Sequence, residues 1–231
     1  MMKTLSPTTN QFMNKKYKAL FFDTDGTLLD TLQDILDAVN YSLKECGYTK
    51  QYQYEEGKKL IGGGAYKLAE RAISFAPPTK EKYDQFQKLF FEKYLQLQDH
   101  TTKPFDGMID LLLSLKENYK LYIVSNKPQF LLDDIISKTF PNDLFIEACG
   151  HKIENPEKPD PILINYLVDK YHLNKNECLM IGDSLTDIET AINACVDSCL
   201  VTFGYGLNIE SIKEKATFVA NSVSDLSNLL M

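Results

Sequence analysis

Two aspartates stand directly behind a short apolar segment near the start of the chain, and their carboxylates are the first candidates for chemistry. The apolar residues 19–22 are followed by Asp23, Thr24, Asp25 and Gly26. A short apolar run bounded by turn residues predicts a buried strand, whose alternate side chains share one side. Open α/β sheets place functional sites at the carboxyl ends of such strands. Because Asp-Gly after a strand can also be a simple turn, other motifs must decide.

Three further polar clusters stand at predicted strand ends or helix starts. They are Ser125-Asn126-Lys127 after the apolar segment 121–124, Lys158-Pro159 before a predicted helix, and Gly182-Asp183-Ser184 with Asp187 one helical turn further on. The carboxyl ends of parallel strands meet at one edge of a sheet. We therefore expect these clusters to lie close to Asp23 and Asp25.

These residue types suit phosphate chemistry. Carboxylates from Asp23, Asp25 and Asp183 suit Mg²⁺, which proteins hold through one or two carboxylates together with water and substrate phosphate. A lysine can bind the remaining phosphate oxygens, and an aspartate can itself be a nucleophile that forms an aspartyl-phosphate. The chain has no Gly-x-Ser-x-Gly motif and its three histidines are scattered, which argues against a Ser-His-Asp hydrolase. The glycines 62–64 lack the Lys-Ser/Thr that a P-loop requires.

Taken together, the motifs resemble those of the haloacid dehalogenase superfamily, in its phosphatase branch. The matching segments, in the family's order, are DTDGTLLDT at 23–31, SN at 125–126, KPDP at 158–161 and GDSLTD at 182–187. The resemblance implies an α/β fold: a Rossmann-like parallel sheet with helices on both faces. It also implies a helical cap domain inserted after the first strand.

The resemblance implies the catalytic and metal-binding roles. Asp23 would be the nucleophile and a metal ligand. Asp25 would be the general acid and base, and its backbone carbonyl would bind the metal. Asp183 would complete the Mg²⁺ site.

The resemblance also implies the residues that hold the phosphoryl group. Ser125 and Lys158 would hold the transferring group during catalysis, while Thr27 and Asn126 would add phosphate contacts. Asp187 would be a direct or an indirect metal ligand.

The aspartate at position 25 narrows the reaction class. Dehalogenases and phosphonatases of this superfamily lack an aspartate there, because they have no alkoxide leaving group to protonate. The segment 61–73, IGGGAYKLAERAI, resembles the cap of phosphoglycolate phosphatases. We therefore expect a Mg²⁺-dependent phosphatase acting on a small, phosphoglycolate-like monoester. Lys67 or Arg71 could reach a substrate carboxylate, although the glycines before them could also form only a helix–helix loop.

Several alternatives stay open on the same scaffold. They are a pyrophosphatase, a nucleotidase, a sugar-phosphate phosphatase and a β-phosphoglucomutase-like mutase. A non-enzymatic binding protein is a further alternative, but every catalytic position of the family is filled, which argues against it.

Hydrophobic periodicity predicts the elements that must position these residues. Apolar residues at helical spacing predict a helix from Thr31, its N-cap, to Gly47, its stop signal. Further helical patterns follow the glycines 62–64 and cover residues 79–98. From residue 104 onward helical segments alternate with apolar strands, which predicts a parallel sheet. The strands are expected at 121–124 and within 144–150, 177–182, 198–206 and 216–222.

This pattern predicts a chain with an interrupted core domain. We expect a loose N-terminal extension over 1–15, an α/β core domain from 16–30 and 101–231, and an inserted helical cap domain over 31–100.

Composition limits the partners. The net charge is −7, which argues against nucleic acid, and no apolar run approaches the ~20 residues of a membrane span. The five cysteines form no Cys-x-x-Cys pair, which predicts reduced thiols in a cytoplasmic protein. The expected partner is a small phosphorylated metabolite, while the oligomeric state is not readable from the sequence.

Overall fold

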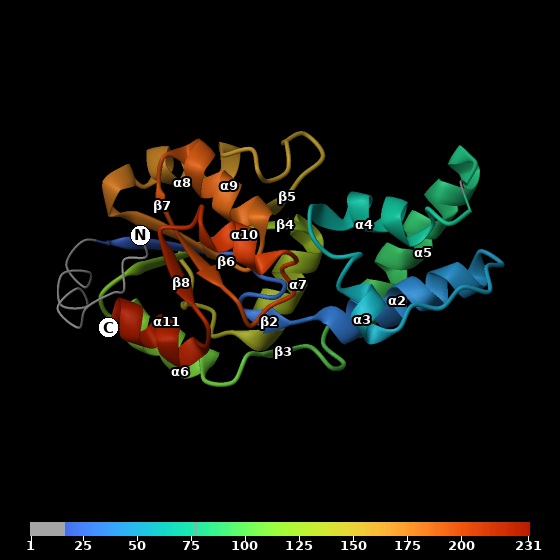
Figure 1. The fold of residues 1–231 in the computed structure, drawn as a ribbon, viewed down its shortest axis with the longest axis horizontal. Helices are drawn as coiled ribbons and strands as arrows, with labels where there is room; N and C mark the ends of the chain where they lie inside the picture. Colours follow the sequence, from blue (N-terminus) through green and yellow to red (C-terminus); the bar gives the residue numbers. More distant parts are fainter. Residues whose placement is uncertain (1–16, 77) are drawn as a thin grey trace.

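The computed structural model describes residues 17–76 and 78–231, and a six-stranded parallel sheet lies at its centre (Figure 1). The strand order is β5-β4-β1-β6-β7-β8. The strands are β1 (Ala19–Phe22), β4 (Lys120–Pro128), β5 (Glu147–His151), β6 (Cys178–Gly182), β7 (Asp197–Val201) and β8 (Phe218–Ala220). The extension expected at 1–15 lies outside the described residues.

The first strand has a central place in the sheet. Strand β1 pairs in parallel with β4 on one side and with β6 on the other, so that Phe22 is in register with Ile123 and with Ile181. The residues that follow these three positions therefore emerge side by side at one sheet edge. The polar clusters that follow β1 and β6 and the one within the carboxyl end of β4 come together for this reason.

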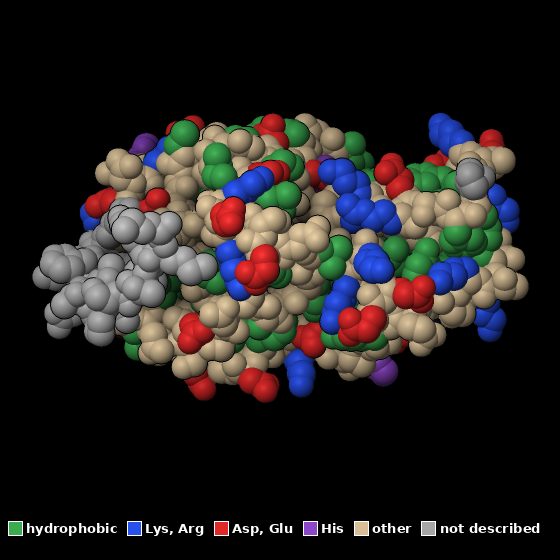
Figure 2. All heavy atoms as spheres, viewed as in Figure 1, with side chains coloured by type: hydrophobic (Ala, Val, Ile, Leu, Met, Phe, Trp, Pro, Cys, Tyr) green, Lys and Arg blue, Asp and Glu red, His purple; other side chains and the backbone are tan. Residues whose placement is uncertain are grey.

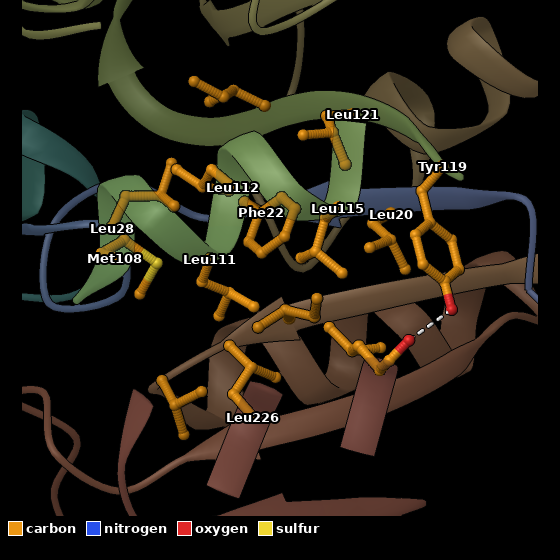
Figure 3. Packing of buried hydrophobic residues seen from close by; sticks show 14 of the residues in the cluster. Leu20, Phe22, Leu28, Met108, Leu111, Leu112, Leu115, Tyr119, Leu121 and Leu226 are labelled. Carbon is orange, nitrogen blue, oxygen red and sulfur yellow. Dashed lines mark hydrogen bonds between the residues drawn. The ribbon is translucent and has the colours of Figure 1, made fainter. Parts of the chain in front are cut away.

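Helices cover both faces of the sheet, as the α/β class predicts. Leu20 and Phe22 of β1 pack on one face against the helices α6 (Met108–Lys116), α7 (Gln129–Thr139) and α11 (Val223–Leu230). Figure 3 shows Phe22 between Leu112 of α6 and Leu226 of α11, with Leu20 next to Leu115 of α6. Phe21 points to the opposite face, which α8 (Ile162–Lys170) and α9 (Leu185–Ala194) cover. The helix α10 (Ile209–Lys213) packs against α9 and β7.

A second group of helices lies at the end of the molecule away from both termini (Figure 1). It consists of α2 (Leu32–Glu45), α3 (Tyr54–Gly57), α4 (Gly64–Ala72) and α5 (Lys80–Leu97). These helices have an apolar cluster of their own, in which Val39 of α2, Ala69 of α4 and Phe86 of α5 are fully buried. We propose that this group is the inserted helical domain expected over 31–100.

The connections between the helical group and the sheet differ from the sequence prediction. Two short strands, β2 (Leu29–Asp30) and β3 (Lys103–Pro104), pair in antiparallel fashion where the chain leaves the sheet and returns to it. The buried carboxylate of Asp34 ties the same two connections together. It accepts hydrogen bonds from the backbone N–H groups of Thr101 and Thr102. Two-residue strands carry no periodicity, so the sequence pattern did not indicate them.

The start of α2 confirms Thr31 as the N-cap residue, but the capping hydrogen bonds come from elsewhere. Thr31 occupies the N-cap position, but its side chain makes no capping hydrogen bond. The hydroxyl of Tyr205 instead accepts the backbone N–H of Thr31 at 2.5 Å and that of Leu32 at 3.0 Å. Gly47 follows the helix with a φ of +82°, as predicted for the stop. A side chain from a distant loop thus replaces the local cap.

The second strand of the core is longer than predicted. The sequence indicated a strand over 121–124 and a helix from Pro128, whereas β4 continues to Pro128 before α7 begins. The register between β4 and β5 shifts between Val124 and Pro128, so the polar residues after the apolar run stay extended.

Among the described residues, no helix combines the length and the apolar character that crossing a bilayer would need.

We expect Leu20→Ala to lower the free energy of unfolding by about 2–5 kcal/mol, because it leaves a cavity in the fully buried core. Urea denaturation followed by circular dichroism measures this loss. The matched control is Leu113→Ala on α6, where the side chain is 43% exposed, and it should change the free energy by about 0.5 kcal/mol or less. Equal losses of unfolding free energy in the two variants would contradict the central place of β1 in the core.

Candidate active site

A cavity of about 360 Å³ opens at the carboxyl ends of β1, β4 and β6. Asp23, Asp25, Ser125, Lys158 and Asp183 all line it, together with residues of α4 and α5. The structure therefore brings these five predicted site residues together from distant parts of the chain. Small-molecule sites occur preferentially in concave places of this kind.

The Lys158 ammonium group lies at the centre of the site and is almost fully buried. Its Nζ lies 2.8 Å from Oδ1 of Asp23, 2.6 Å from Oδ1 of Asp187 and 3.0 Å from the carbonyl oxygen of Val124. Burial alone would lower the pKa of Lys158, but the attraction of Asp187 and Asp23 outweighs it and raises this pKa. Lys158 is therefore a permanent positive charge beside Asp23.

Asn126 holds Lys158 in place through its side-chain amide. Its Oδ1 accepts the backbone N–H of Lys158 at 2.7 Å, and its Nδ2 donates to the Lys158 carbonyl oxygen at 3.1 Å. Both atoms of the Asn126 amide are hydrogen-bonded to Lys158. The predicted phosphate contact of Asn126 would therefore have to come from its backbone N–H. The side chain positions the lysine.

Three carboxylates form a compact acidic cluster. Ligand atoms of Asp23, Asp183 and Asp187 lie within 4.8 Å of one another. Burial, followed by repulsion from Asp187 and Asp23, raises the pKa of Asp183 well above its usual range. Burial is also the main reason why the pKa of Asp23 rises to about 6, although Lys158 opposes the rise. Holding this cluster ionised requires further positive charge.

A divalent cation fits this cluster. The base of the cavity contains four carboxylates and two ammonium groups, which leaves two uncompensated negative charges; the groups are Asp23, Asp25, Asp183, Asp187, Lys127 and Lys158. Oxygen donors of this kind suit Mg²⁺. The charge and the chemistry of the donors thus agree with the predicted metal.

The hydrogen bonds indicate which oxygens could bind the cation. Oδ2 of Asp183 accepts the backbone N–H groups of Tyr205 at 2.6 Å and Gly206 at 3.1 Å. Within the described residues, Oδ1 of Asp183 and Oδ2 of Asp23 accept no hydrogen bond. Both oxygens of Asp187 are used, by Lys158 and by the N–H and hydroxyl groups of Ser184. The Asp187 carboxylate therefore links Lys158 to Ser184 at the start of α9.

Asp25 has a different environment from Asp23. Its Oδ1 lies 3.2 Å from Nζ of Lys127, and its side chain is 20% exposed towards the cavity. The carboxylate of Asp25 is not part of the acidic cluster, which leaves its backbone carbonyl as the predicted metal ligand. The two aspartates therefore contact different lysines and can perform different chemistry.

Lys127 and Tyr94 are site residues to which the sequence analysis gave no role. The Nζ of Lys127 donates to the hydroxyl of Tyr94 at 2.5 Å and lies 4.3 Å from the centre of its ring. Burial lowers the pKa of Lys127, while Asp25 opposes this change. Lys127 directly follows the predicted site residues Ser125 and Asn126, so its place in the sequence could have indicated that it belongs to the site. Tyr94 was one member of an aromatic helical stripe, which nothing in the pattern distinguished from core.

Ser125 and Thr27, both predicted to contact phosphate, differ in position. Ser125 lines the cavity, and its hydroxyl accepts the backbone N–H of Lys127 at 3.3 Å. Thr27 is fully buried and is not among the residues that line the cavity. Its hydroxyl is without a hydrogen-bond partner in the described parts of the chain. The phosphate contact of Thr27 therefore stays a prediction.

Across the cavity from the sheet edge, the wall is formed by the helix α4 and by residues 60–64, which we call the glycine loop. Lys67 and Arg71 of α4 both line this wall, and Figure 2 shows basic side chains gathered over α4. Nη1 of Arg71 donates to the carbonyl oxygens of Leu60, Ile61 and Gly62, which fixes the loop. The Nη1 group of Arg71 is thus used within the chain itself.

The glycine loop has a structural requirement of its own. Gly63 and Gly64 have φ angles of +78° and +89°, which other residues rarely adopt. A Cβ atom at Gly64 would also overlap the carboxylate of Glu157, which precedes Lys158. Lys67 lies 3.8 Å from this carboxylate. The loop therefore brings the helical group into close contact with the segment that carries Lys158.

Comparison with known proteins gives a consistent result. A family model described as haloacid dehalogenase-like hydrolase matches residues 20–201. The chain is 31% identical over 208 residues to a phosphoglycolate phosphatase of Psychrobacter arcticus, covering 86% of this chain and 90% of the relative. It is 28% identical over 223 residues to a phosphoglycolate phosphatase of Vibrio vulnificus, and the match covers 94% of this chain and 97% of that relative. The crystal structure of a predicted phosphoglycolate phosphatase from Haemophilus somnus superposes with a TM-score of 0.87 at 27% identity, covering 93% and 98%.

We expect Asp183→Asn to weaken Mg²⁺ binding at least about tenfold, because it removes a charged ligand but keeps the acceptor for Tyr205 and Gly206. Isothermal titration calorimetry on the cation-free protein measures the affinity. Asp160→Asn, outside the cavity, is the control and should bind Mg²⁺ like the wild type. Unchanged affinity in the Asp183 variant would show that the cation binds elsewhere.

Cation binding should also depend on pH around the Asp23 pKa of about 6. Below this value the folded, cation-free protein carries a proton on Asp23, and the proton competes with the cation. Raising the pH through about 6 removes the proton from Asp23 and tightens binding, and the raised pKa of Asp183 shifts binding in the same direction. Titrations at about pH 5 and about pH 7.5 test the sign. Equal affinities at the two pH values would contradict the assignment of Asp23 and Asp183 as ligands.

Proposed function

Because the chain belongs to the haloacid dehalogenase-like hydrolase family, we propose that it is a Mg²⁺-dependent phosphatase for a small, phosphoglycolate-like monoester. The family and the relatives identify the chain as a phosphoric monoester hydrolase. The observation that carries the finer proposal is the separation of two aspartates at one cavity. Asp23 contacts Lys158 within the acidic cluster, whereas Asp25 contacts Lys127 outside it.

In the first step, a carboxylate oxygen of Asp23 attacks phosphorus. The bond between phosphorus and the ester oxygen breaks, and Asp25 gives its proton to the departing alkoxide. Lys158 lies beside the nucleophile and offsets the negative charge of the approaching phosphoryl group. Ser125 lines the same space and offers its hydroxyl as a donor. The products are an alcohol and an aspartyl-phosphate on Asp23.

In the second step, Asp25 has lost its proton and acts as a general base. It takes a proton from a water molecule, whose oxygen attacks phosphorus and breaks the bond to Asp23. Inorganic phosphate leaves, and Asp23 regains its carboxylate while Asp25 regains its proton. The contact with Lys127 keeps Asp25 directed towards the cavity through both steps.

The metal would be held by the oxygens that the chain leaves free. These are Oδ2 of Asp23, Oδ1 of Asp183 and the backbone carbonyl of Asp25. A bound Mg²⁺ neutralises charge on the phosphate and orients it. Asp187 keeps Lys158 in place beside this site.

The cavity favours a small anionic substrate. Its volume of about 360 Å³ is at the lower end for ligand sites, and α4 and α5 close one side. Lys127 and Lys67 add positive charge beyond the position of the phosphate. The relatives with similar sequences are phosphoglycolate phosphatases, whose substrate carries a carboxylate next to the phosphoester. These observations support phosphoglycolate over neutral sugar phosphates.

The proposed setting of the enzyme is the cytoplasm, with a small phosphorylated metabolite as its partner. All five cysteines are free, and four of them are buried. Reduced thiols of this kind are typical of proteins in reducing compartments.

Phosphate release from a substrate panel with Mg²⁺ tests the proposed function. The panel contains phosphoglycolate, pyrophosphate, a mononucleotide, β-glucose 1-phosphate and p-nitrophenyl phosphate. We expect phosphoglycolate to have the highest kcat/KM, and Asp23→Asn to lower kcat at least about a thousandfold because the nucleophile is lost. Thermal denaturation shows whether the variant is folded. Wild-type rates in a folded Asp23→Asn protein, or no phosphate release from any panel member, would overturn the proposal.

A further inference from the structure

We propose that the Lys127 ammonium group binds the negative charge that the substrate carries beyond its phosphate, and that Tyr94 positions Lys127 for this task. The inference rests on the proposed function and extends it, because it names the residues that recognise the carboxylate of the leaving group. Lys127 belongs to β4 of the sheet and Tyr94 to α5 of the helical group. The recognition site is therefore assembled from both parts of the molecule.

Lys127 is a buried cation with a donor to spare. Its side chain is 2% exposed, yet it lines the cavity. An ammonium group has three N–H donors, and within the described residues two acceptors take them, Oδ1 of Asp25 and the hydroxyl of Tyr94. Burying a charge is costly unless it is paired and hydrogen-bonded. The third donor is satisfied most simply by an anionic substrate group in the cavity.

The other cations that line the cavity are less suitable. Lys158 has three acceptors for its three donors, so that none is left for the leaving group. Nη1 of Arg71 donates to three backbone carbonyl groups of the loop before α4, and within the described residues Arg71 makes no hydrogen bond or ion pair with Asp25, beside which the leaving group lies. The Lys67 side chain is 49% exposed and lies close to the carboxylate of Glu157. An exposed and already compensated charge contributes little to affinity.

The position of Lys127 matches the shape of the substrate. Asp25 protonates the ester oxygen in the proposed mechanism, so this oxygen lies next to its carboxyl group. Nζ of Lys127 lies 3.2 Å from the same carboxyl group. In phosphoglycolate a single methylene separates the ester oxygen from the carboxylate, a distance of about 3 Å. The substrate carboxylate therefore falls within reach of Lys127 when the ester oxygen is at Asp25.

Tyr94 fixes the direction of the lysine. Its side chain is 2% exposed and stacks on Phe90 with ring centres 5.6 Å apart. Its hydroxyl accepts from Nζ of Lys127 at 2.5 Å, and the ring lies under the same ammonium group. An aromatic face attracts a cation. A rigid ring from α5 thus holds a flexible side chain from β4.

The test compares two substrates that differ in one charged group, phosphoglycolate and 2-hydroxyethyl phosphate. Both have alkyl leaving groups that need protonation by Asp25, so the ratio of their kcat/KM values reports carboxylate recognition. Lys127→Met should lower this ratio at least about tenfold, because a charge-assisted hydrogen bond is lost. Lys120→Met, at the exposed start of β4, is the matched control and should leave the ratio unchanged.

The outcomes separate this inference from the proposed function. A Lys127→Met enzyme that loses rate equally on both substrates would show that the lysine only supports Asp25, and would overturn the inference alone. A wild-type enzyme without preference for phosphoglycolate would overturn both. Tyr94→Phe should lower the ratio about threefold through looser positioning of the lysine. If Lys127→Met does not fold, Tyr94→Phe decides, and an unchanged ratio there overturns the inference.

Discussion

The contact of one buried ammonium group with three acceptors is the interaction on which the site depends. Lys158 joins Asp23 after β1, Asp187 of α9 and the carbonyl oxygen of Val124 in β4. Removing one member of a buried charge pair leaves an uncompensated charge, at a cost of about 3–5 kcal/mol. The surrounding residues serve to keep this group in place. Asn126 clamps the backbone of Lys158.

Pairing with a buried lysine also distinguishes Asp23 from Asp25, the two aspartates of the proposed mechanism. Asp23 lies in a crowded acidic cluster, where burial raises its pKa to about 6 and where a cation and Lys158 must keep it ionised. Asp25 lies outside the cluster beside Lys127. Two carboxylates that are close in sequence thus have different neighbours. In the proposed mechanism, these different neighbours suit Asp23 to bond to phosphorus and Asp25 to move a proton.

The sequence predicted what depends on local pattern. Apolar runs indicated the strands of the sheet, and polar residues at their ends indicated which side chains would meet, including Asp23, Asp183 and Lys158. Contacts between distant elements had no such signal. Tyr94 in α5 looked like any core aromatic residue until the fold placed it under Lys127. The direction of an individual side chain was equally hidden, as the buried hydroxyl of Thr27 shows.

The paired connections β2 and β3 have a consequence for how the two parts of the molecule can move. Because β2 and β3 are hydrogen-bonded to each other, and Asp34 of α2 accepts from Thr101 and Thr102 just before β3, the two connections form one short ribbon instead of two independent tethers. A ribbon bends across its flat face without losing hydrogen bonds, but shearing would break them. A displacement of the helical group that keeps these hydrogen bonds is therefore a bend of this ribbon, and a sliding movement of one connection along the other breaks them.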